Sequence, residues 1–206
     1  MKRLTIGIVD YGVGNLASVR HALHTMGYRC RIAGNSETLS QSDLLLLPGV
    51  GAFPAAMQAL HASDLGDILC QQALGGKPVV GICLGMQLLA DSSTELGLTA
   101  GLGLIPGKVV ALEESRWHIG WNSIEVVRDE PLFMNSDGQA MYFNHSFVFD
   151  APSQYQKAVA RMDEFSEPFT VGVRHNNVVG LQFHPEKSQA AGRHMLASVI
   201  EGLCRA

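Results

Sequence analysis

Two side chains capable of nucleophilic and acid–base chemistry stand directly after apolar runs. The first is Cys83, which lies in Gly-Ile-Cys-Leu-Gly (residues 81–85) between the apolar run Val79–Ile82 and a helical run, Met86–Ala90. In a strand-to-helix turn this tight, the middle residue is held in a strained backbone conformation, and the flanking glycines prevent clashes. A sulfur at a helix N-terminus meets backbone N–H groups that favour the thiolate, which is the nucleophilic form. The pattern therefore predicts a cysteine nucleophile on an elbow.

The second side chain belongs to His184-Pro185-Glu186, which follows the apolar run Val178–Phe183. His184 is suited to accept the thiol proton and to return it to a leaving amine. Pro185 stiffens the turn, and the Glu186 carboxylate is suited to orient the imidazole. Alone, a cysteine after a strand is usually a small buried hydrophobe, and His-Pro-Glu is usually a surface turn. Together, in this order, they predict a triad of Cys83, His184 and Glu186.

Two further segments are candidates for holding a substrate. Pro48–Gly51 follows the apolar run Leu44–Leu47, and its glycines allow backbone N–H groups to approach a tetrahedral oxyanion. Asn144–Phe147 lies in a segment of strand composition and offers backbone groups to a small polar substrate. We expect a structural role for His145, because His184 already supplies the base. The candidate residues are Gly49, Val50, Gly51, Asn144, His145, Ser146 and Phe147.

The elements that must position these residues alternate in the first half of the chain. Strands are predicted at Leu4–Val9, Arg29–Ala33, Leu44–Leu47 and Val79–Ile82, and helices at Asn15–Met26, Ala55–His61 and Leu65–Leu74. Asn15 is a plausible N-cap for the first helix. The Leu44–Leu47 run is apolar throughout, as a strand buried on both faces of a parallel sheet requires. This rhythm predicts an α/β fold with a doubly wound, mostly parallel open sheet, and a site at the carboxyl ends of its strands.

From about Gly103 the pattern changes to strands and turns. We expect extra antiparallel strands in this half and a closing helix near Ala190–Leu203. The predicted strands are Lys108–Leu112, Asn122–Val127, Ala140–Phe149, Gln156–Met162, Thr170–Arg174 and Val178–Phe183. The sequence contains no internal repeat and no Pro- or Ser-rich linker, so residues 1–206 are predicted to form a single domain.

Composition narrows the classes of function. The 206 residues are 47% hydrophobic and 17% charged, as in an ordinary globular protein, and the net charge of −4 with no basic run argues against nucleic acid as a partner. No apolar stretch approaches the roughly 20 residues that span a bilayer, and no signal-peptide pattern follows Met1, so a cytoplasmic location is expected. The four cysteines and the histidines lack metal-ligand spacing, so no metal or other cofactor is expected.

These motifs carry a resemblance to a known family. Pro-Gly-Val-Gly, Gly-Ile-Cys-Leu-Gly-Met-Gln and His-Pro-Glu, in that order, resemble the class I (triad) glutamine amidotransferases, whose fold is flavodoxin-like. More narrowly, Asp10–Asn15 (Asp-Tyr-Gly-Val-Gly-Asn), His118–Asn122 (His-Ile-Gly-Trp-Asn) and Glu186–Ser188 resemble the glutaminase subunits of imidazole glycerol phosphate synthases. The resemblance covers nearly the whole chain.

The resemblance implies a role for each motif. It assigns the nucleophile, base and orienting carboxylate to Cys83, His184 and Glu186, and the oxyanion strand to Gly49 and Gly51. It implies that glutamine is held by Leu84, Gln87 and the Asn144–Phe147 segment, although Asn144 stands where an aliphatic residue is usual and Phe147 where tyrosine is usual. The residues expected to face the partner are Asn15, Trp121, Asn122 and Lys187.

The implied partner is a (β/α)₈-barrel synthase subunit that receives ammonia from this chain. The complex would form imidazole glycerol phosphate and an aminoimidazole carboxamide ribotide in histidine biosynthesis. The peptide between Gly49 and Val50 is free to flip its N–H towards or away from the site, so we expect the isolated chain to be poorly active and the partner with its acceptor ligand to raise turnover.

Several alternatives remain open at this stage. The chain is also consistent with a glutaminase subunit that serves another synthase, or with a different Cys–His hydrolase of similar fold that acts on peptides or small carbonyl compounds. A non-catalytic binding homologue is disfavoured by the intact triad. Trp117 and Trp121, four residues apart, are either core residues or interface anchors.

Overall fold

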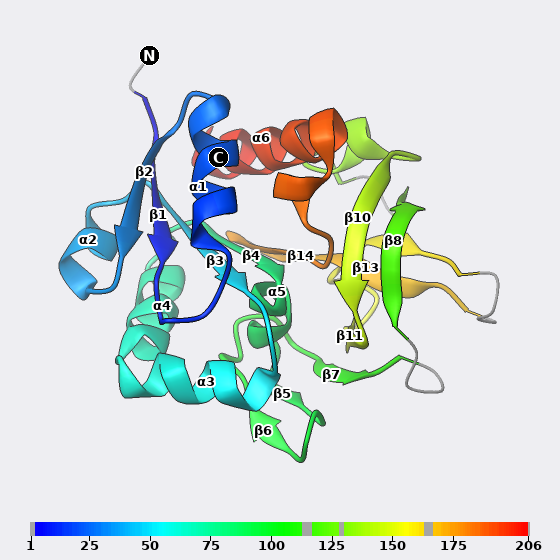
Figure 1. The fold of residues 1–206 in the computed structure, drawn as a ribbon, viewed down its shortest axis with the longest axis horizontal. Helices are drawn as coiled ribbons and strands as arrows, with labels where there is room; N and C mark the ends of the chain where they lie inside the picture. The colour runs from blue at the N-terminus through cyan, green and yellow to red at the C-terminus, as the bar shows by residue number, and fades with distance from the viewer. Residues whose placement is uncertain (1–2, 113–116, 128–129, 163–166, 206) are drawn as a thin grey trace.

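An eight-stranded sheet forms the centre of the molecule in the computed structural model, which describes residues 3–112, 117–127, 130–162 and 167–205 (Figure 1). The strand order is β2-β1-β3-β4-β14-β13-β12-β9. The first five strands are parallel, and the remaining three are antiparallel to their neighbours. In sheet order, the strands are β2 (Arg29–Ala33), β1 (Thr5–Val9), β3 (Leu44–Gly49), β4 (Val79–Cys83), β14 (Val178–Leu181), β13 (Phe169–His175), β12 (Gln156–Ala160) and β9 (Glu125–Val126).

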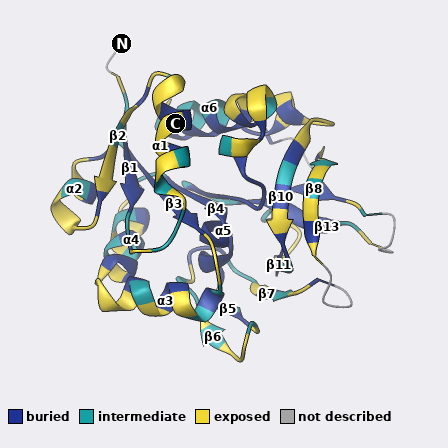
Figure 2. Ribbon diagram, in the orientation of Figure 1, coloured by how far each residue is buried: buried dark blue, intermediate teal, exposed yellow. Residues whose placement is uncertain are grey.

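The central strands are apolar because both faces of the sheet are covered. Successive side chains of a strand point to opposite faces, and β3 divides its leucines accordingly: Leu44 and Leu46 join one hydrophobic core, and Leu45 and Leu47 the other. Helices α1 (Leu16–Thr25) and α6 (Gln189–Arg205) contribute to the first core, while α2 (Ser36–Ser40), α3 (Phe53–Ala62), α4 (Leu65–Leu74) and α5 (Leu84–Leu88) contribute to the second. Figure 2 shows the buried central strands and the exposed outer faces of helices α1, α3 and α6.

The predicted fold class and the order of strands and helices in the first half are confirmed. Element ends differ by a few residues from those expected, and the α4 bounds agree. Asn15 is the N-cap of α1, since its side-chain oxygen accepts a hydrogen bond from the Ser18 backbone N–H at 3.2 Å. The short helix α2 was not predicted, because five residues give little periodicity to detect.

Two smaller sheets stand beside the main one, and here the prediction needs correction. The expected strand Ala140–Phe149 is two strands, β10 (Ala140–His145) and β11 (Phe147–Asp150), which separate at Ser146 and pair in different sheets. The expected strand Asn122–Val127 is also divided: β8 starts earlier, at His118–Ser123, and β9 joins the main sheet. β8 and β10 form an antiparallel ribbon, whereas β11 pairs with β7 (Lys108–Ala111), in the sheet that also contains β5 (Ser92–Ser93) and β6 (Thr99–Ala100).

The two halves of the chain meet in the main sheet. β14, from the C-terminal half, pairs in parallel with β4 and places its own carboxyl end beside that of β4. That residues 1–206 form one domain stays a prediction. Three-residue 3₁₀ turns η2 (Met134–Ser136) and η3 (Pro185–Lys187) complete the description. Within the described ranges, no helix combines the length and the apolar character needed to cross a membrane.

Candidate active site

Cys83 lies at the point where β4 ends and α5 begins. Its φ of 54° and ψ of −114° are unusual for a residue with a side chain, and they belong to the tight elbow that the sequence predicts. The flanking glycines are required because the backbone around them leaves no room for a side chain. A Cβ on Gly81 would lie 2.5 Å from the Gly85 carbonyl oxygen, and a Cβ on Gly85 would overlap the carbonyl oxygen of Leu47. The backbone itself therefore presents the sulfur at the carboxyl edge of the sheet.

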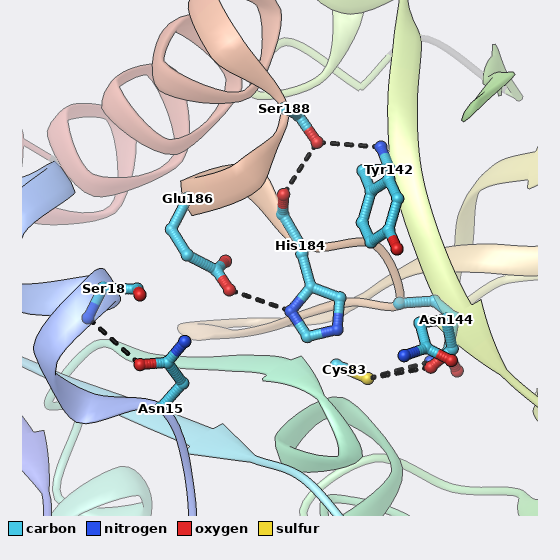
Figure 3. Close-up of polar contacts among 9 residues, drawn as sticks. Asn15, Ser18, Cys83, Tyr142, Asn144, His184, Glu186 and Ser188 are labelled. Carbon is cyan, nitrogen blue, oxygen red and sulfur yellow. Dashed lines mark hydrogen bonds and ion pairs between the residues drawn. The ribbon is translucent and has the colours of Figure 1, made fainter. Parts of the chain in front are cut away.

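His184 and Glu186 reach the same edge from the end of β14. His184 Nδ1 lies 2.9 Å from Glu186 Oε1, and both side chains are buried. The imidazole is directed towards Cys83 (Figure 3). Burial lowers the pKa of His184, but hydrogen bonding to Cys83 and Glu186, together with their negative charges, outweighs burial and raises the pKa to about 9. The site therefore favours a protonated imidazole between a sulfur and a carboxylate.

Backbone hydrogen bonds fix His184 to the ribbon. Its N–H donates to the Tyr142 carbonyl of β10 at 2.9 Å, and its carbonyl accepts from the Ser188 hydroxyl at 2.7 Å. The Ser188 oxygen in turn accepts from the Tyr142 N–H at 2.9 Å (Figure 3). Neither Tyr142 nor Ser188 was predicted, because their contribution depends on pairing between segments far apart in the chain.

The Cys83 sulfur has two further neighbours. It lies 3.9 Å from the Asn144 carbonyl oxygen and accepts from Gln182 Nε2 at 3.9 Å. Gln182 is completely buried, and its Oε1 accepts from Gln87 Nε2 at 3.0 Å. Gln182 was not predicted as a site residue, although a glutamine inside an otherwise apolar run is a signal that could have identified it.

A cavity of about 430 Å³ opens over the sulfur, a size typical of small-molecule sites. It brings together nearly all of the predicted substrate residues. Gly49 and Glu186 are not in its wall, and Glu95 and Trp117 are lining residues that were not predicted for it. The wall consists of Val50, Gly51, Cys83, Leu84, Gln87, Glu95, Trp117, Asn144, His145, Ser146, Phe147, His184 and Lys187.

The predicted oxyanion strand runs beside the nucleophile. The register of β3 and β4 pairs Gly49 with Cys83. A Cβ at Gly49 would lie 2.8 Å from the Tyr11 hydroxyl, and Gly51 has a φ of 92°, which favours glycine. The buried Tyr11 hydroxyl donates to the Pro48 carbonyl at 2.9 Å. Burial, and then the charge of Cys83, raise the pKa of Tyr11, so its hydroxyl stays a donor.

Three of the four expected partner-facing residues are exposed. Asn15, Trp121 and Lys187 lie at the surface, and Lys187 Nζ is 5.7 Å from the centroid of the Tyr142 ring. Asn122 differs, because it is half-buried and its amide donates to the Arg161 carbonyl at 2.8 Å. Trp121 is 52% exposed and Trp117 63%, so the alternative that they are core residues is wrong.

His145 lies in the cavity wall and pairs with a second histidine. Its Nδ1 is 2.9 Å from the Phe147 carbonyl, and its Nε2 is 3.0 Å from His118 Nδ1. Burial chiefly lowers the pKa of His145 to about 3, and burial lowers that of His118 to about 4, so both rings are neutral near pH 7. Among the described residues, no group of three His, Cys, Asp or Glu is arranged to hold a metal ion.

Comparison with known proteins agrees with this geometry. The family described as "Glutamine amidotransferase class-I" matches residues 7–201. Solved structures similar in fold include a putative GMP synthase component from Thermoplasma acidophilum (22% identity, TM-score 0.74, covering 100% of this chain and 96% of that one) and PurLQS from Thermotoga maritima (20% identity, TM-score 0.78, covering 98% and 100%). The chain belongs to the class-I glutamine amidotransferase family.

Curated relatives within this family carry a narrower name. "Imidazole glycerol phosphate synthase subunit HisH 2" of Vibrio vulnificus is 41% identical over 205 residues, covering 96% of this chain and 94% of that protein. "Imidazole glycerol phosphate synthase subunit HisH" is 40% identical both in Streptococcus gordonii (94% of each chain) and in Listeria monocytogenes serovar 1/2a (95% of each). The likeness to these HisH subunits extends along nearly the whole chain.

Proposed function

We propose that this chain is the HisH-type glutaminase subunit of an imidazole glycerol phosphate synthase, acting in histidine biosynthesis. The observation that carries the proposal is the alignment of Cys83, His184 and Glu186 at the carboxyl edge of the sheet, beside a cavity sized for a small molecule. Full-length similarity to HisH subunits supports the choice of synthase. The two solved structures share the fold at 20–22% identity, which says nothing about the synthase that this chain serves.

In the first half of the reaction, the Cys83 thiolate attacks the side-chain amide carbon of glutamine. The resulting oxyanion is stabilised by backbone N–H groups of the Gly49–Gly51 strand, which runs beside the sulfur. His184 carries the thiol proton, and Glu186 stabilises the imidazolium. When the tetrahedral intermediate collapses, the C–N bond breaks and His184 protonates the departing nitrogen. The products are ammonia and a γ-glutamyl thioester on Cys83.

In the second half, water attacks the thioester carbon. His184, now neutral, accepts a proton from that water, and the same backbone N–H groups stabilise the second oxyanion. The C–S bond then breaks, glutamate leaves, and the Cys83 thiolate and the His184 imidazolium are restored. No cofactor is needed for either half.

Ammonia becomes protonated in bulk water at neutral pH, so direct transfer to an acceptor site is the useful outcome. The relatives are named as subunits, which implies a synthase partner. We infer that the partner is a (β/α)₈-barrel synthase subunit, which docks on β8. Trp117, Ile119 and Trp121 support this choice of surface, because they alternate along residues 117–121 and are 63%, 59% and 52% exposed.

We propose a cytoplasmic location for the complex.

The decisive experiment measures glutamate release from glutamine by the purified chain, first alone and then with the barrel partner and its ribotide ligand. We expect low release by the chain alone and a large rise in the full mixture, because a flip of the Gly49–Val50 peptide would turn its N–H away from the oxyanion and a partner would set its orientation. High glutaminase activity without the partner would contradict this gating, and no release in any mixture with Cys83 reduced would contradict the glutaminase assignment.

Cysteine variants provide the control. We expect Cys83→Ala to abolish glutamine-dependent synthesis while synthesis from added ammonia continues. Cys70→Ala is the matched control, because Cys70 is a free thiol in α4 whose sulfur contacts the Leu102 carbonyl and which is outside the cavity wall. Glutamine-dependent synthesis by the Cys83→Ala complex would exclude the thioester mechanism.

A further inference from the structure

Two buried histidines connect the cavity to the exposed strand β8. His118 and His145 are directly opposite each other in the β8–β10 ribbon, and His118 Nδ1 lies 3.0 Å from His145 Nε2. At one end, His145 Nδ1 is 2.9 Å from the carbonyl oxygen of Phe147, a residue of the cavity wall. At the other end, His118 Nε2 is 3.2 Å from Asn122 Nδ2. We call these side chains, Asn122, His118 and His145, the histidine row.

The direction of every hydrogen bond in the histidine row follows from its ends. The Phe147 carbonyl only accepts, so His145 carries its proton on Nδ1, and its Nε2 is then an acceptor when the ring is neutral. His118 must therefore donate from Nδ1, which leaves its Nε2 to accept from the Asn122 amide. The same amide donates to the Arg161 carbonyl at 2.8 Å, so its orientation is also determined. A proton added to either ring would face a donor.

Aromatic rings enclose the two histidines. Phe143 stacks on His118 with centroids 4.4 Å apart, and Phe169 packs edge-on against it at 5.3 Å. Both histidines are 5% exposed. A neutral imidazole in such a site is held by its hydrogen bonds, and losing one leaves a buried polar atom unpaired. The row thus ties two positions of the backbone together through side-chain hydrogen bonds.

The cavity end of the row continues to the nucleophile. The Phe147 carbonyl also accepts from Gln87 Nε2 at 2.9 Å. Gln87 Nε2 donates in addition to Gln182 Oε1 at 3.0 Å, and Gln182 Nε2 lies 3.9 Å from the Cys83 sulfur. One backbone oxygen, at Phe147, is therefore the point where the histidine row meets the side chains that contact the sulfur.

We propose that His118 and His145 are positioning residues for glutamine hydrolysis, which fix the Phe147 carbonyl and the Asn144–Phe147 wall relative to Asn122 on β8. The inference rests on the proposed glutaminase function. It assigns a role to His118, which the reaction itself does not use, and extends the structural role expected for His145. A partner seated on β8 would act on the glutamine cavity through this row.

The test compares two substitutions at His118 in the assembled complex with saturating ribotide ligand. His118→Leu removes the donor to His145, whereas His118→Asn keeps an N–H at the position of Nδ1. We expect His118→Leu to raise the KM for glutamine about tenfold, the size of effect that follows when a buried hydrogen bond is lost and its partner is left unpaired, with a smaller change in kcat. His118→Asn should stay within about threefold of wild type. Synthesis from added ammonia should be unchanged in both.

His175→Leu is the matched control. His175 is a half-buried histidine whose Nδ1 lies 3.1 Å from the Leu104 carbonyl, and it is outside the cavity wall. We expect its KM for glutamine to equal that of wild type. If His118→Leu behaves like His175→Leu in an active complex, or if His118→Asn is as impaired as His118→Leu, the inference is overturned while the proposed function stands. A wild-type complex without glutaminase activity overturns both.

A second measurement needs no substitution and no activity. Nitrogen NMR chemical shifts of the imidazoles in the wild-type chain report which nitrogen carries the proton. We expect the Nδ1–H tautomer at both His118 and His145 at pH 7. An Nε2–H tautomer at His118, or a charged ring at either position, would overturn the directed row whatever the kinetics show.

Discussion

The carboxyl edge of the main sheet and the β8–β10 ribbon contribute to one cavity by different physical means. At the sheet edge, the backbone does the positioning: Cys83 has a φ of 54°, and its flanking glycines leave no room for a Cβ. In the ribbon, side-chain hydrogen bonds do it, through His118 and His145, on a two-stranded element that is exposed at Ile119 and Trp121. We call the sheet edge the rigid edge, because its backbone geometry sets the position of the nucleophile, and the β8–β10 ribbon the adjustable region, because side-chain hydrogen bonds set the position of its cavity wall.

The two regions are nevertheless joined at the proposed base. The Tyr142 carbonyl of the ribbon accepts from the His184 N–H, and the Tyr142 N–H donates to Ser188. A shift of β10 therefore moves the segment that carries His184. Through this contact, a movement of the adjustable region can displace His184 even when no substrate is bound.

The largest effect is expected at the rigid edge. Gly85→Ala places a Cβ on the Leu47 carbonyl oxygen, so the elbow and β3 cannot both keep their positions. We expect a loss of about 4 kcal/mol or more in unfolding free energy, measured by urea denaturation. Gly66→Ala, in helix α4, is the control: its Cβ would make an ordinary 3.5 Å contact with the Leu102 side chain, and a gain of about 0.5 kcal/mol is expected. Equal stability of the two variants would show that the elbow is not held by its backbone.

The next largest effect is expected from the negative charge of Glu186, which contacts the proposed base His184. Glu186→Gln keeps the shape but removes the negative charge that helps to raise the pKa of His184. We expect glutamine-dependent turnover to fall about 10³-fold, as when the carboxylate of a triad is neutralised, with synthesis from ammonia unchanged. Glu201→Gln, on the exposed face of α6, is the control. A loss of less than tenfold would show that the carboxylate does not serve the base.

The rigid edge is also the part that the sequence predicts best. The elbow, the triad and the oxyanion strand each occupy a few consecutive residues directly after an apolar strand. Parallel strands bring their carboxyl ends to one edge, so local patterns at Cys83, His184 and Pro48–Gly51 were enough to predict which residues meet.

The adjustable region was largely missed, for a physical reason. The division of residues 140–149 at Ser146 follows from pairing with two different sheets, which a continuous run of strand formers does not reveal. His118 and His145 are 27 residues apart, and their hydrogen bond depends on the register of β8 against β10. Tyr11 acts through a contact with a segment far along the chain, so no local pattern identifies it, whereas the polar Gln182 inside an apolar run was a local signal left unused.

A substitution on the exposed face of the ribbon tests the adjustable region from the partner's side. Trp121→Ala removes a large side chain that is 52% exposed and packs edge-on against Tyr142 at 5.9 Å. We expect about 30-fold weaker binding to the synthase partner in a calorimetric titration, the effect of losing an interface anchor, with little change in stability. Leu74→Ala is the control, since Leu74 is 85% exposed at the end of α4. Equal affinities of the two variants for the partner would show that β8 is not part of the interface.

The two regions should also differ in how their histidines respond to pH. Burial lowers the pKa of His118 to about 4 from its ordinary value of 6.5, so the stability that its neutral form contributes is present above pH 6.5 and is lost as the pH falls towards 4. The pKa of His184 is raised to about 9, so its contribution is present below pH 6.5 and is lost as the pH rises through 9.

Urea denaturation at several pH values tests the first of these signs. The difference in unfolding free energy between wild type and His118→Leu should be largest at pH 7 and should shrink towards pH 4. The difference between wild type and Leu74→Ala, which involves no titratable group, should stay constant. A gap for His118→Leu that grows in acid would mean that His118 is charged in the folded protein.

The smallest effect is expected at Tyr11, whose side chain makes a hydrogen bond to the rigid edge. Tyr11→Phe removes the hydroxyl that donates to the Pro48 carbonyl, and the unpaired oxygen is then buried next to the oxyanion strand. We expect a cost of about 1 kcal/mol in stability and a roughly fivefold lower kcat with glutamine, because a single hydrogen bond restrains a strand that β-pairing already holds. Tyr28→Phe, whose hydroxyl lies 3.4 Å from Glu201 and outside the cavity wall, should leave kcat unchanged. A loss as large as that of Glu186→Gln would show that the oxyanion strand depends on its side-chain anchor more than on the backbone.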